Sequence, residues 1–417
     1  MLVLHPVRRP GLGSRRRLTA AFAAAAVTLP VLAACSADAG DTAGEAPRSA
    51  ATESETPAAE ETPAPPVRLV VNAGPRKPVP VDTLLEVSAR NGSLERVSVQ
   101  SANGALRLPG ELKGNRTWRA SERLEPGRTY RIAATSVDED GKTKRLQRTF
   151  KSVPLTLDQQ TYASIAPIEG ETVGVGMPVV VAFDVPVTDR ASIEEHLSVQ
   201  SSPRQPGTWH WISDHEVHWR PKTYWRPGTD VTVDADINGV DAGAGIYGQE
   251  DRTTRFTVGD AVVMDVDVAA HTMKVSSNGR VLRTIPISAG KPGFTTRSGV
   301  KVIIEKFRTK TMDAATTGIE PGDPEYYNIE NVEYAQRVTY SGEFLHAAPW
   351  SVGSQGAANV SHGCVGMSTE AAAWLYGITK RGDIVDVTGS DRAMEATNGW
   401  GDWNVPWRQY QQGSALS

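Results

Sequence analysis

The chain has 417 residues, a formal net charge of −4, 39% hydrophobic residues and 22% charged residues. This length and composition predict a globular protein with several domains. The slightly acidic balance gives no reason to expect nucleic-acid binding.

The first 35 residues have the pattern of an export signal. An arginine-rich segment precedes an apolar run from Leu18 to Ala34, which is typical of a signal peptide and too short for an ordinary membrane span. The run ends in Leu-Ala-Ala-Cys, which resembles a lipobox with Cys35 as the lipidated first residue of the mature protein. The alternative is an ordinary secretory cleavage site that contains a cysteine. We expect a protein tied to the outer leaflet of the cytoplasmic membrane, in the cell-wall space.

Residues 36–66 predict a disordered tether. They are almost all Ala, Asp, Glu, Thr, Ser, Gly and Pro, and such a segment cannot bury enough apolar surface to fold.

An internal repeat follows the tether. Trp118-Arg119 stands eight residues before Pro126-Gly127, and Trp219-Arg220 stands eight residues before Pro227-Gly228. Each Pro-Gly pair leads into an alternating strand. Short strands separated by Gly, Pro and Asn turns predict two immunoglobulin-like β-sandwiches, at 67–152 and 153–259.

Three histidines of the second module invite a metal assignment. His210, His215 and His218 lie in two alternating segments around a turn, with no cysteine and no regular ligand spacing. We therefore read them as residues on strand faces and predict no metal site.

From Val262 onward the β pattern continues into a third domain, 260–390. Asn278-Gly279 predicts a hairpin turn. One helix is predicted from about Thr369 to Tyr376, with Ser368 as its N-cap and Gly377 as its stop, and a strand follows at 384–387.

The main chemical feature of this domain is Ser361-His362-Gly363-Cys364, with His346 upstream and fourteen residues between His346 and Ser361. An imidazole can take a thiol proton, and the resulting thiolate is a strong nucleophile. Gly363 lets the backbone approach a substrate closely. Cys364 also precedes the predicted helix, whose dipole could favour the thiolate. The structural alternative is a small buried cysteine near two packed histidines.

This motif, together with Tyr340–His346, Ala348–Ser351 and Lys380–Val385, resembles the signature of the L,D-transpeptidase family. The resemblance implies a mainly β protein: two immunoglobulin-like β-sandwiches followed by a YkuD-type β-sandwich catalytic domain with a short helix. It implies that Cys364 attacks a peptidoglycan tetrapeptide stem, releases D-Ala and forms a thioester, which a second stem converts into a 3→3 cross-link. It also implies inhibition by β-lactams of the carbapenem type, and no cofactor.

The resemblance also implies roles for individual residues. His346 is the expected general base, oriented by the backbone carbonyl of Ala347. His362 shapes the loop or is merely structural, and the amides of residues 362–364 are candidates for an oxyanion hole. The family usually has asparagine where this chain has Gly366, which puts one hydrogen bond in doubt. The expected substrate-binding residues are Met312, Tyr327, Trp350, Ser361 and Asn359.

Other functions use the same residues. Water as acceptor makes the enzyme an L,D-carboxypeptidase, and a protein amine makes it an anchoring enzyme. A different class is a non-catalytic cell-wall-binding lipoprotein, against which the intact His346 and Cys364 argue. A sortase-like cysteine peptidase fits the motif poorly.

The C-terminal segment, 391–417, contains three tryptophans within eight residues: Trp400, Trp403 and Trp407. They carry too much apolar area to leave in water. We expect this tail to pack irregularly on the catalytic domain, against the second β-sandwich. The alternative is an aromatic patch that binds a membrane surface or a partner.

Overall fold

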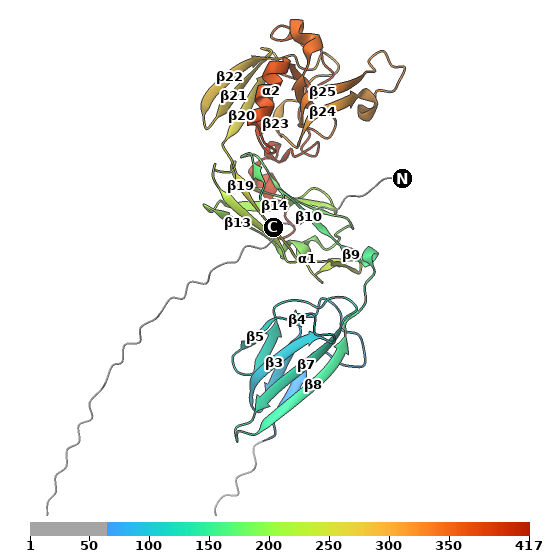
Figure 1. Ribbon diagram of the computed structural model, residues 1–417, viewed down its shortest axis with the longest axis vertical. Coiled ribbons are helices and arrows are strands. Elements are labelled where there is room, and N and C mark those ends of the chain that lie inside the picture. Colours follow the sequence, from blue (N-terminus) through green and yellow to red (C-terminus); the bar gives the residue numbers. More distant parts are fainter. Residues whose placement is uncertain (1–64) are drawn as a thin grey trace, which may run out of the picture. The chain divides into compact units, whose positions relative to one another are not determined.

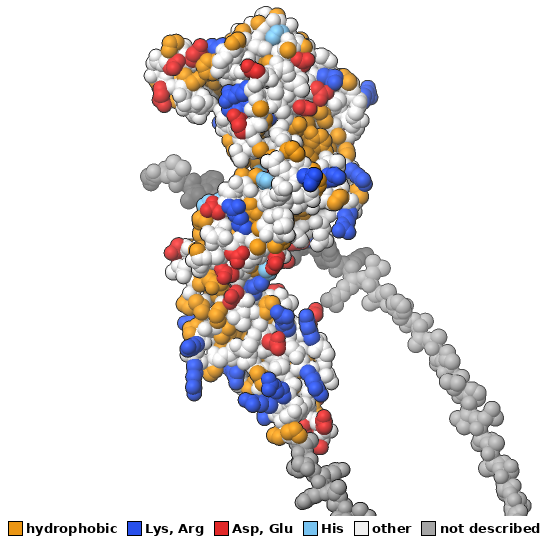
Figure 2. Space-filling view, turned by 180° about the vertical axis from the view of Figure 1, so that it is seen from behind, with side chains coloured by type: hydrophobic (Ala, Val, Ile, Leu, Met, Phe, Trp, Pro, Cys, Tyr) orange, Lys and Arg blue, Asp and Glu red, His pale blue; other side chains and the backbone are white. Residues whose placement is uncertain are grey.

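The computed structural model describes residues 65–417 (Figure 1). The expected signal peptide, Cys35 and nearly all of the tether lie outside the described residues. Within 65–417, no helix is long and apolar enough to cross a membrane. Figure 2 shows acidic and basic side chains mixed in the upper part of the face it draws, while basic side chains gather in the lower part.

The first β module is a sandwich of two four-stranded sheets, in the orders β1-β2-β6-β5 and β4-β3-β7-β8. Its core lies between the sheets and includes Trp118, Leu124, Tyr130 and Phe150. The strands are β1 Arg68–Val71, β2 Glu86–Arg90, β3 Ser93–Ser101, β4 Arg107–Leu108, β5 Gly110–Lys113, β6 Thr117–Ala120, β7 Thr129–Val137 and β8 Thr143–Lys151.

The second module repeats this plan with the orders β10-β12-β15-β14 and β11-β19-β16-β13, and adds a small sheet, β17-β18-β9. The predicted Pro-Gly starts are confirmed, because β7 and β16 begin just after them. The elements are η1 Leu157–Gln159, β9 Gln160–Thr161, β10 Ala163–Ala166, β11 Thr172–Val173, β12 Val179–Phe183, α1 Arg190–Glu194, β13 Leu197–Ser202, β14 Gly207–Trp211, β15 Glu216–Pro221, β16 Asp230–Ala235, β17 Asp241–Gly243, β18 Ile246–Gly248 and β19 Arg252–Val258.

The third domain has a five-stranded sheet, β22-β21-β20-β28-β23, and a four-stranded sheet, β24-β25-β26-β27. Helix α2 packs on β25 and β26 (Figure 1), and one core joins it to both sheets. The elements are β20 Val262–Asp267, β21 Thr272–Ser277, β22 Arg280–Pro286, β23 Gly299–Val302, β24 Glu305–Asp313, η2 Ala314–Thr317, β25 Asn328–Arg337, β26 Phe344–Ala347, η3 Pro349–Ser354, β27 Val365–Met367, α2 Thr369–Ile378 and β28 Ile384–Thr388.

Two local predictions in this domain are confirmed. Asn278 and Gly279 have φ of 49° and 79°, as the tight turn between β21 and β22 requires. Helix α2 begins after Ser368, whose side chain accepts a hydrogen bond from the amide of Ala371. The predicted stop is two residues too early, because α2 continues through Gly377 to Ile378 and Thr379 is the C-cap.

The C-terminal segment forms η4, Asp402–Asn404, and a short helix α3, Trp407–Gln411. The expectation of a wholly irregular tail is therefore wrong. Pro406 starts the helix instead of preventing it, because proline at a helix start sacrifices no intrahelical hydrogen bond.

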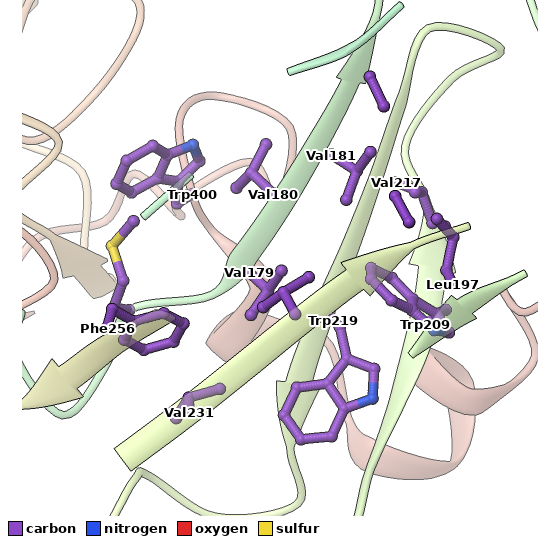
Figure 3. Close-up of a cluster of buried hydrophobic side chains, with 14 of the residues drawn as sticks. Val179, Val180, Val181, Leu197, Trp209, Val217, Trp219, Val231, Phe256 and Trp400 are labelled. Atoms are coloured by element: carbon purple, nitrogen blue, oxygen red, sulfur yellow. The ribbon is translucent and has the colours of Figure 1, made fainter. Parts of the chain in front are cut away.

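Trp400 is 6% exposed and belongs to a core cluster that joins residues of the second module to Val302 and Ile384 of the third domain. Figure 3 shows its indole beside Val180 of β12. Trp403 Nε1 donates to the carbonyl of Gly176 at 2.8 Å. The tail thus contributes apolar surface where the second module meets the third domain.

The histidine cluster of the second module serves packing. His210 stacks on Tyr410 with ring centroids 4.5 Å apart, and His218 is buried against Asp402 and Glu216. Among residues 65–417, no group of three or more His, Cys, Asp or Glu is arranged to hold a metal ion.

Candidate active site

Strand β26 carries His346, and Cys364 immediately precedes β27. The two strands pair in parallel, with Leu345 opposite Val365 and His346 opposite Gly366. By the same register Cys364 aligns with Phe344, two positions before His346. Because side chains two residues apart share a sheet face, the register places the thiol and the imidazole on the same side.

That side opens into a cavity of about 200 Å³. Cys364 and His346 both line it, as do four of the predicted substrate-binding residues. The full lining is Ser288, Met312, Tyr327, Ile329, His346, Ala348, Trp350, Ser351, Val360, Ser361, His362, Cys364 and Gly366. Trp350 is 55% exposed and stacks on His346 with ring centroids 5.9 Å apart.

The Cys364 thiol is protonated at neutral pH. Burial raises its pKa to about 12, the charge of Glu343 adds to the rise, and the Phe344 backbone, Lys301 and Arg337 oppose it. The thiol donates a hydrogen bond to the carbonyl oxygen of Gly342 at 3.5 Å. The expected thiolate at a helix N-terminus is therefore absent in this resting arrangement, because strand β27 separates Cys364 from α2.

His346 is buried and neutral. Its Nδ1 lies 2.8 Å from the carbonyl oxygen of Ala347, so Nδ1 carries the hydrogen and Nε2 carries the free lone pair. Burial lowers the pKa of the ring below its ordinary value, and the Ala347 contact only partly offsets this. The imidazole can thus accept a proton at Nε2, as a general base must.

The backbone of the Ser361–Cys364 loop is held by its own side chains. Ser361 Oγ accepts from the amide of Gly363 at 3.1 Å and donates to the carbonyl of Cys364 at 2.6 Å. Gly363 has φ of 124°, which favours glycine. Its amide is already paired, which removes it from the candidate oxyanion-hole donors. Among the described residues, the amides of His362 and Cys364 have no hydrogen-bond partner and are available.

His362 contacts the segment that precedes β25. Its Nε2 lies 2.8 Å from Oε2 of Glu325, which also pairs with Lys291. The His362 ring packs against Tyr327 and Phe294, with centroids 4.9 and 4.6 Å away. Glu325 was not predicted from the sequence. The one signal for it was its position directly before Tyr326 and Tyr327, the latter a predicted substrate-binding residue.

Asn359 is the one predicted substrate-binding residue that does not line the cavity. Its Oδ1 accepts from the Ala289 amide at 2.9 Å and lies 3.0 Å from His271 Nδ1. Its Nδ2 donates to the carbonyl of Val268 at 2.9 Å. These bonds occupy its side-chain amide, so Asn359 ties the loop before Ser361 to neighbouring segments.

Gly366 lies in the cavity opposite His346. A Cβ atom there would stand 2.8 Å from Cβ of Ala348. The chain therefore has no room for a side chain at this position without a shift of β26. Ser288, Ile329 and Ser351 also line the cavity, and no local sequence pattern pointed to them.

Comparison with known proteins finds two family models in this chain. Residues 261–387 match the model of the L,D-transpeptidase catalytic domain, and residues 76–241 match a bacterial Ig domain. L,D-transpeptidase 2 of Mycobacterium tuberculosis is 38% identical over 81% of this chain and 82% of its own length. L,D-transpeptidase 5 of the same species is 33% identical over 80% of this chain and 73% of its own length.

A solved structure of an L,D-transpeptidase in complex with imipenem is 40% identical, covers 55% of this chain and 99% of its own, and has a TM-score of 0.49. The fold and site define a mainly β enzyme with a cysteine and a histidine on one face of a sheet. On the sequence relatives, the chain belongs to the L,D-transpeptidase family.

Proposed function

We propose that this L,D-transpeptidase forms 3→3 cross-links in peptidoglycan through a thioester on Cys364. The observation that carries the proposal is that a protonated thiol and a neutral imidazole line one cavity from neighbouring parallel strands. The donor is a tetrapeptide stem with a diamino acid at its third position, followed by D-Ala. The acceptor is the side-chain amine of a second stem.

In the first step, Sγ of Cys364 bonds to the carbonyl carbon of the third residue while its proton passes to Nε2 of His346. The raised thiol pKa and the lowered imidazole pKa keep both groups neutral at rest. Proton transfer therefore accompanies attack. The amides of His362 and Cys364, which have no hydrogen-bond partner among the described residues, are the proposed donors to the developing oxyanion. The bond to D-Ala then breaks, and the leaving amine takes the proton from His346.

In the second step, the acceptor amine attacks the thioester and loses a proton to His346, and the thiol of Cys364 is restored. The covalent intermediate divides amide exchange into two easier reactions and conserves the acyl group for the acceptor. Trp350 stands at the cavity rim, 55% exposed, where it can cover an arriving stem.

The test is to incubate the purified protein with disaccharide-tetrapeptide and analyse the products by mass spectrometry, with Cys364→Ala as control. A dimer that has lost one D-Ala supports the proposal. Tripeptide alone assigns water as the acceptor and makes the enzyme a carboxypeptidase. If neither the dimer nor the tripeptide forms, the proposed reaction is refuted.

We also propose that Cys35 is lipidated and anchors the enzyme to the outer face of the cytoplasmic membrane. The arginine-rich leader and the Leu-Ala-Ala-Cys ending support this proposal. Mature protein from the native host should partition into detergent, and Cys35→Ala should release it into buffer. Wild-type protein found in the buffer phase would contradict the anchor.

A further inference from the structure

A cluster of buried charges lies behind the Ser361–Cys364 loop. Lys301 on β23 is 1% exposed, and its Nζ bonds Oε2 of Glu343, which is 4% exposed. Arg297 approaches the other oxygen, with Nη1 3.0 Å and the backbone amide 3.1 Å from Oε1. At the outer end, Nε of Arg297 lies 2.6 Å from Glu395, whose side chain is 53% exposed.

Glu343 lies next to the Ser361–Cys364 loop. A Cβ atom built on Gly363 would lie 3.5 Å from Cγ and 3.7 Å from Oε1 of Glu343, so the carboxylate stands directly behind the residue that precedes the thiol. Glu343 also follows Gly342, whose carbonyl accepts the thiol hydrogen, and precedes β26, which carries His346. The Glu343 carboxylate therefore lies behind the residue that precedes Cys364, and its backbone adjoins the Gly342 carbonyl that the thiol contacts.

Buried ion pairs seldom add net stability, since desolvation costs as much as the attraction returns. Taken without the exposed Glu395, this cluster holds two cations and one anion. Its burial beside a thiol that must lose its proton suggests a role in reactivity.

Resting on the proposed function, in which Cys364 is the nucleophile, we propose that the buried Lys301–Glu343 pair sets the reactivity of Cys364. Glu343 opposes formation of the thiolate, Lys301 favours it, and their bond holds the two opposed charges at fixed positions behind the loop. Both are positioning residues, because neither lines the substrate cavity.

The charges around the thiol agree with this assignment. Glu343 raises the pKa of Cys364 and Lys301 lowers it, while burial of Lys301 lowers the pKa of the ammonium itself. Charged and titratable groups face Cys364 from several elements. Lys301 lies on β23, Arg337 on β25 and His346 on β26. Tyr327 precedes β25, Glu343 precedes β26, and His362 belongs to the Ser361–Cys364 loop.

The test measures alkylation of Cys364 by iodoacetamide in the full chain between pH 7 and 9.5, followed on the peptide that contains Cys364. In this range the rate follows the thiolate fraction, and the lower nucleophilicity of a more acidic thiol offsets part of the gain. We expect Glu343→Gln to react about threefold to tenfold faster than wild type, and Lys301→Met to react slower by a similar factor.

The double variant Lys301→Met/Glu343→Gln should return to within about twofold of the wild-type rate, because the two opposed charges are removed together. Glu333→Gln and Lys274→Met are matched controls, since each removes one partner of an exposed pair. Their alkylation rates should equal that of wild type.

Opposite shifts support the proposal. A purely structural role predicts changes of the same sign in both single variants, or none, and either result overturns it. Glu343→Gln leaves two cations without their carboxylate, so its folding is checked by thermal melting. If Glu343→Gln does not fold, the alkylation rate of Lys301→Met is the deciding measurement, because Arg297 still pairs with Glu343 in that variant. An unchanged alkylation rate in Lys301→Met then overturns the proposal.

Alkylation needs no peptide substrate, which separates this test from that of the proposed function. Opposite shifts in a protein that makes no cross-link would leave the charge assignment standing and refute the reaction. Cross-linking without opposite shifts in the alkylation rate would support the reaction and refute the charge assignment.

Discussion

Nδ1 of His218 lies 2.9 Å from Oδ1 of Asp402, across 184 residues of sequence, and both side chains are almost completely shielded from solvent. The hydroxyl of Tyr410 donates to the same carboxylate oxygen at 2.9 Å, and Glu216 contacts the other nitrogen of His218. This ion pair joins β15 of the second module to the C-terminal segment. Because both partners titrate, we expect the attachment of that segment to depend on pH.

Stability should fall at alkaline pH because of this pair. Burial opposes the charged imidazole, but Asp402 and Glu216 raise the pKa of His218 to about 9. A raised pKa contributes stability that is complete below the ordinary value of 6.5, decreases as pH rises toward 9 and is lost above it. The melting temperature should therefore decrease as the pH is raised from 6.5 to 9.5. A His218→Leu/Asp402→Leu variant should lack this dependence, and the exposed His215→Gln should retain it.

The variant Asp402→Asn tests the same ion pair by removing the carboxylate partner of His218. Burial opposes ionisation of Asp402, yet His218 and Tyr410 hold the pKa of this carboxyl below its ordinary value. The wild-type contribution is thus present above pH 3.8 and is lost as pH falls below it. The substitution leaves His218 buried beside one carboxylate, and we expect it to cost about 3 kcal/mol at pH 7 in urea unfolding. An unchanged midpoint would contradict the ion pair.

Removal of the tail should destabilise the protein. Trp400→Ala deletes a buried indole and should cost about 3–5 kcal/mol, whereas Trp350→Ala, at an exposed site, should change the free energy of unfolding by less than about 1 kcal/mol. Deletion of 399–417 should lower the melting temperature, reduce turnover and leave fewer amides near residues 176 and 302 protected from hydrogen exchange. A deletion variant with unchanged melting temperature and turnover would show the tail to be dispensable.

Carbapenems should acylate Cys364 and add the mass of the drug, while common penicillins react poorly, as the family resemblance implies. Cys364→Ser should fold with the wild-type melting temperature yet lose at least about a thousandfold in acylation rate, because a serine hydroxyl ionises far less readily than a thiol. Mass spectrometry of the intact protein measures both. Adduct formation on the serine variant at the wild-type rate would exclude Cys364 as the nucleophile.

The pH dependence of acylation should reflect His346. Burial lowers the pKa of this imidazole below 6.5, so the ring stays neutral through the neutral range and is protonated only in acid. The acylation rate should therefore stay level through the neutral range and decrease only in acid, below the ordinary imidazole pKa of 6.5. His346→Gln should lose about a hundredfold or more at pH 7. A wild-type rate that begins to fall already near pH 8 would contradict a neutral buried base.

The sequence predicted several features that depend on local pattern, although the end of α2 and the helix after Pro406 were predicted wrongly. Asn278-Gly279 specified its turn because few dipeptides accept positive φ at both positions, and Ser368 specified the start of α2 because its hydroxyl satisfies a free amide. The repeated Trp-Arg and Pro-Gly pairs predicted two similar sandwiches. The motif around Cys364 predicted the family, because its residues and spacing resemble the family signature.

Only the tertiary structure decided how distant residues combine. Parallel pairing of β26 with β27 set the face that Cys364 and His346 share, and burial left the thiol protonated where helix proximity had suggested a thiolate. Asn359 was predicted to bind substrate, but its side-chain amide is bonded to three residues in two segments, the turn at 268–271 and Ala289. The pairs Lys301–Glu343 and His218–Asp402 join residues 42 and 184 positions apart. No local pattern predicts such pairs, because their energy depends on burial, which the whole fold creates.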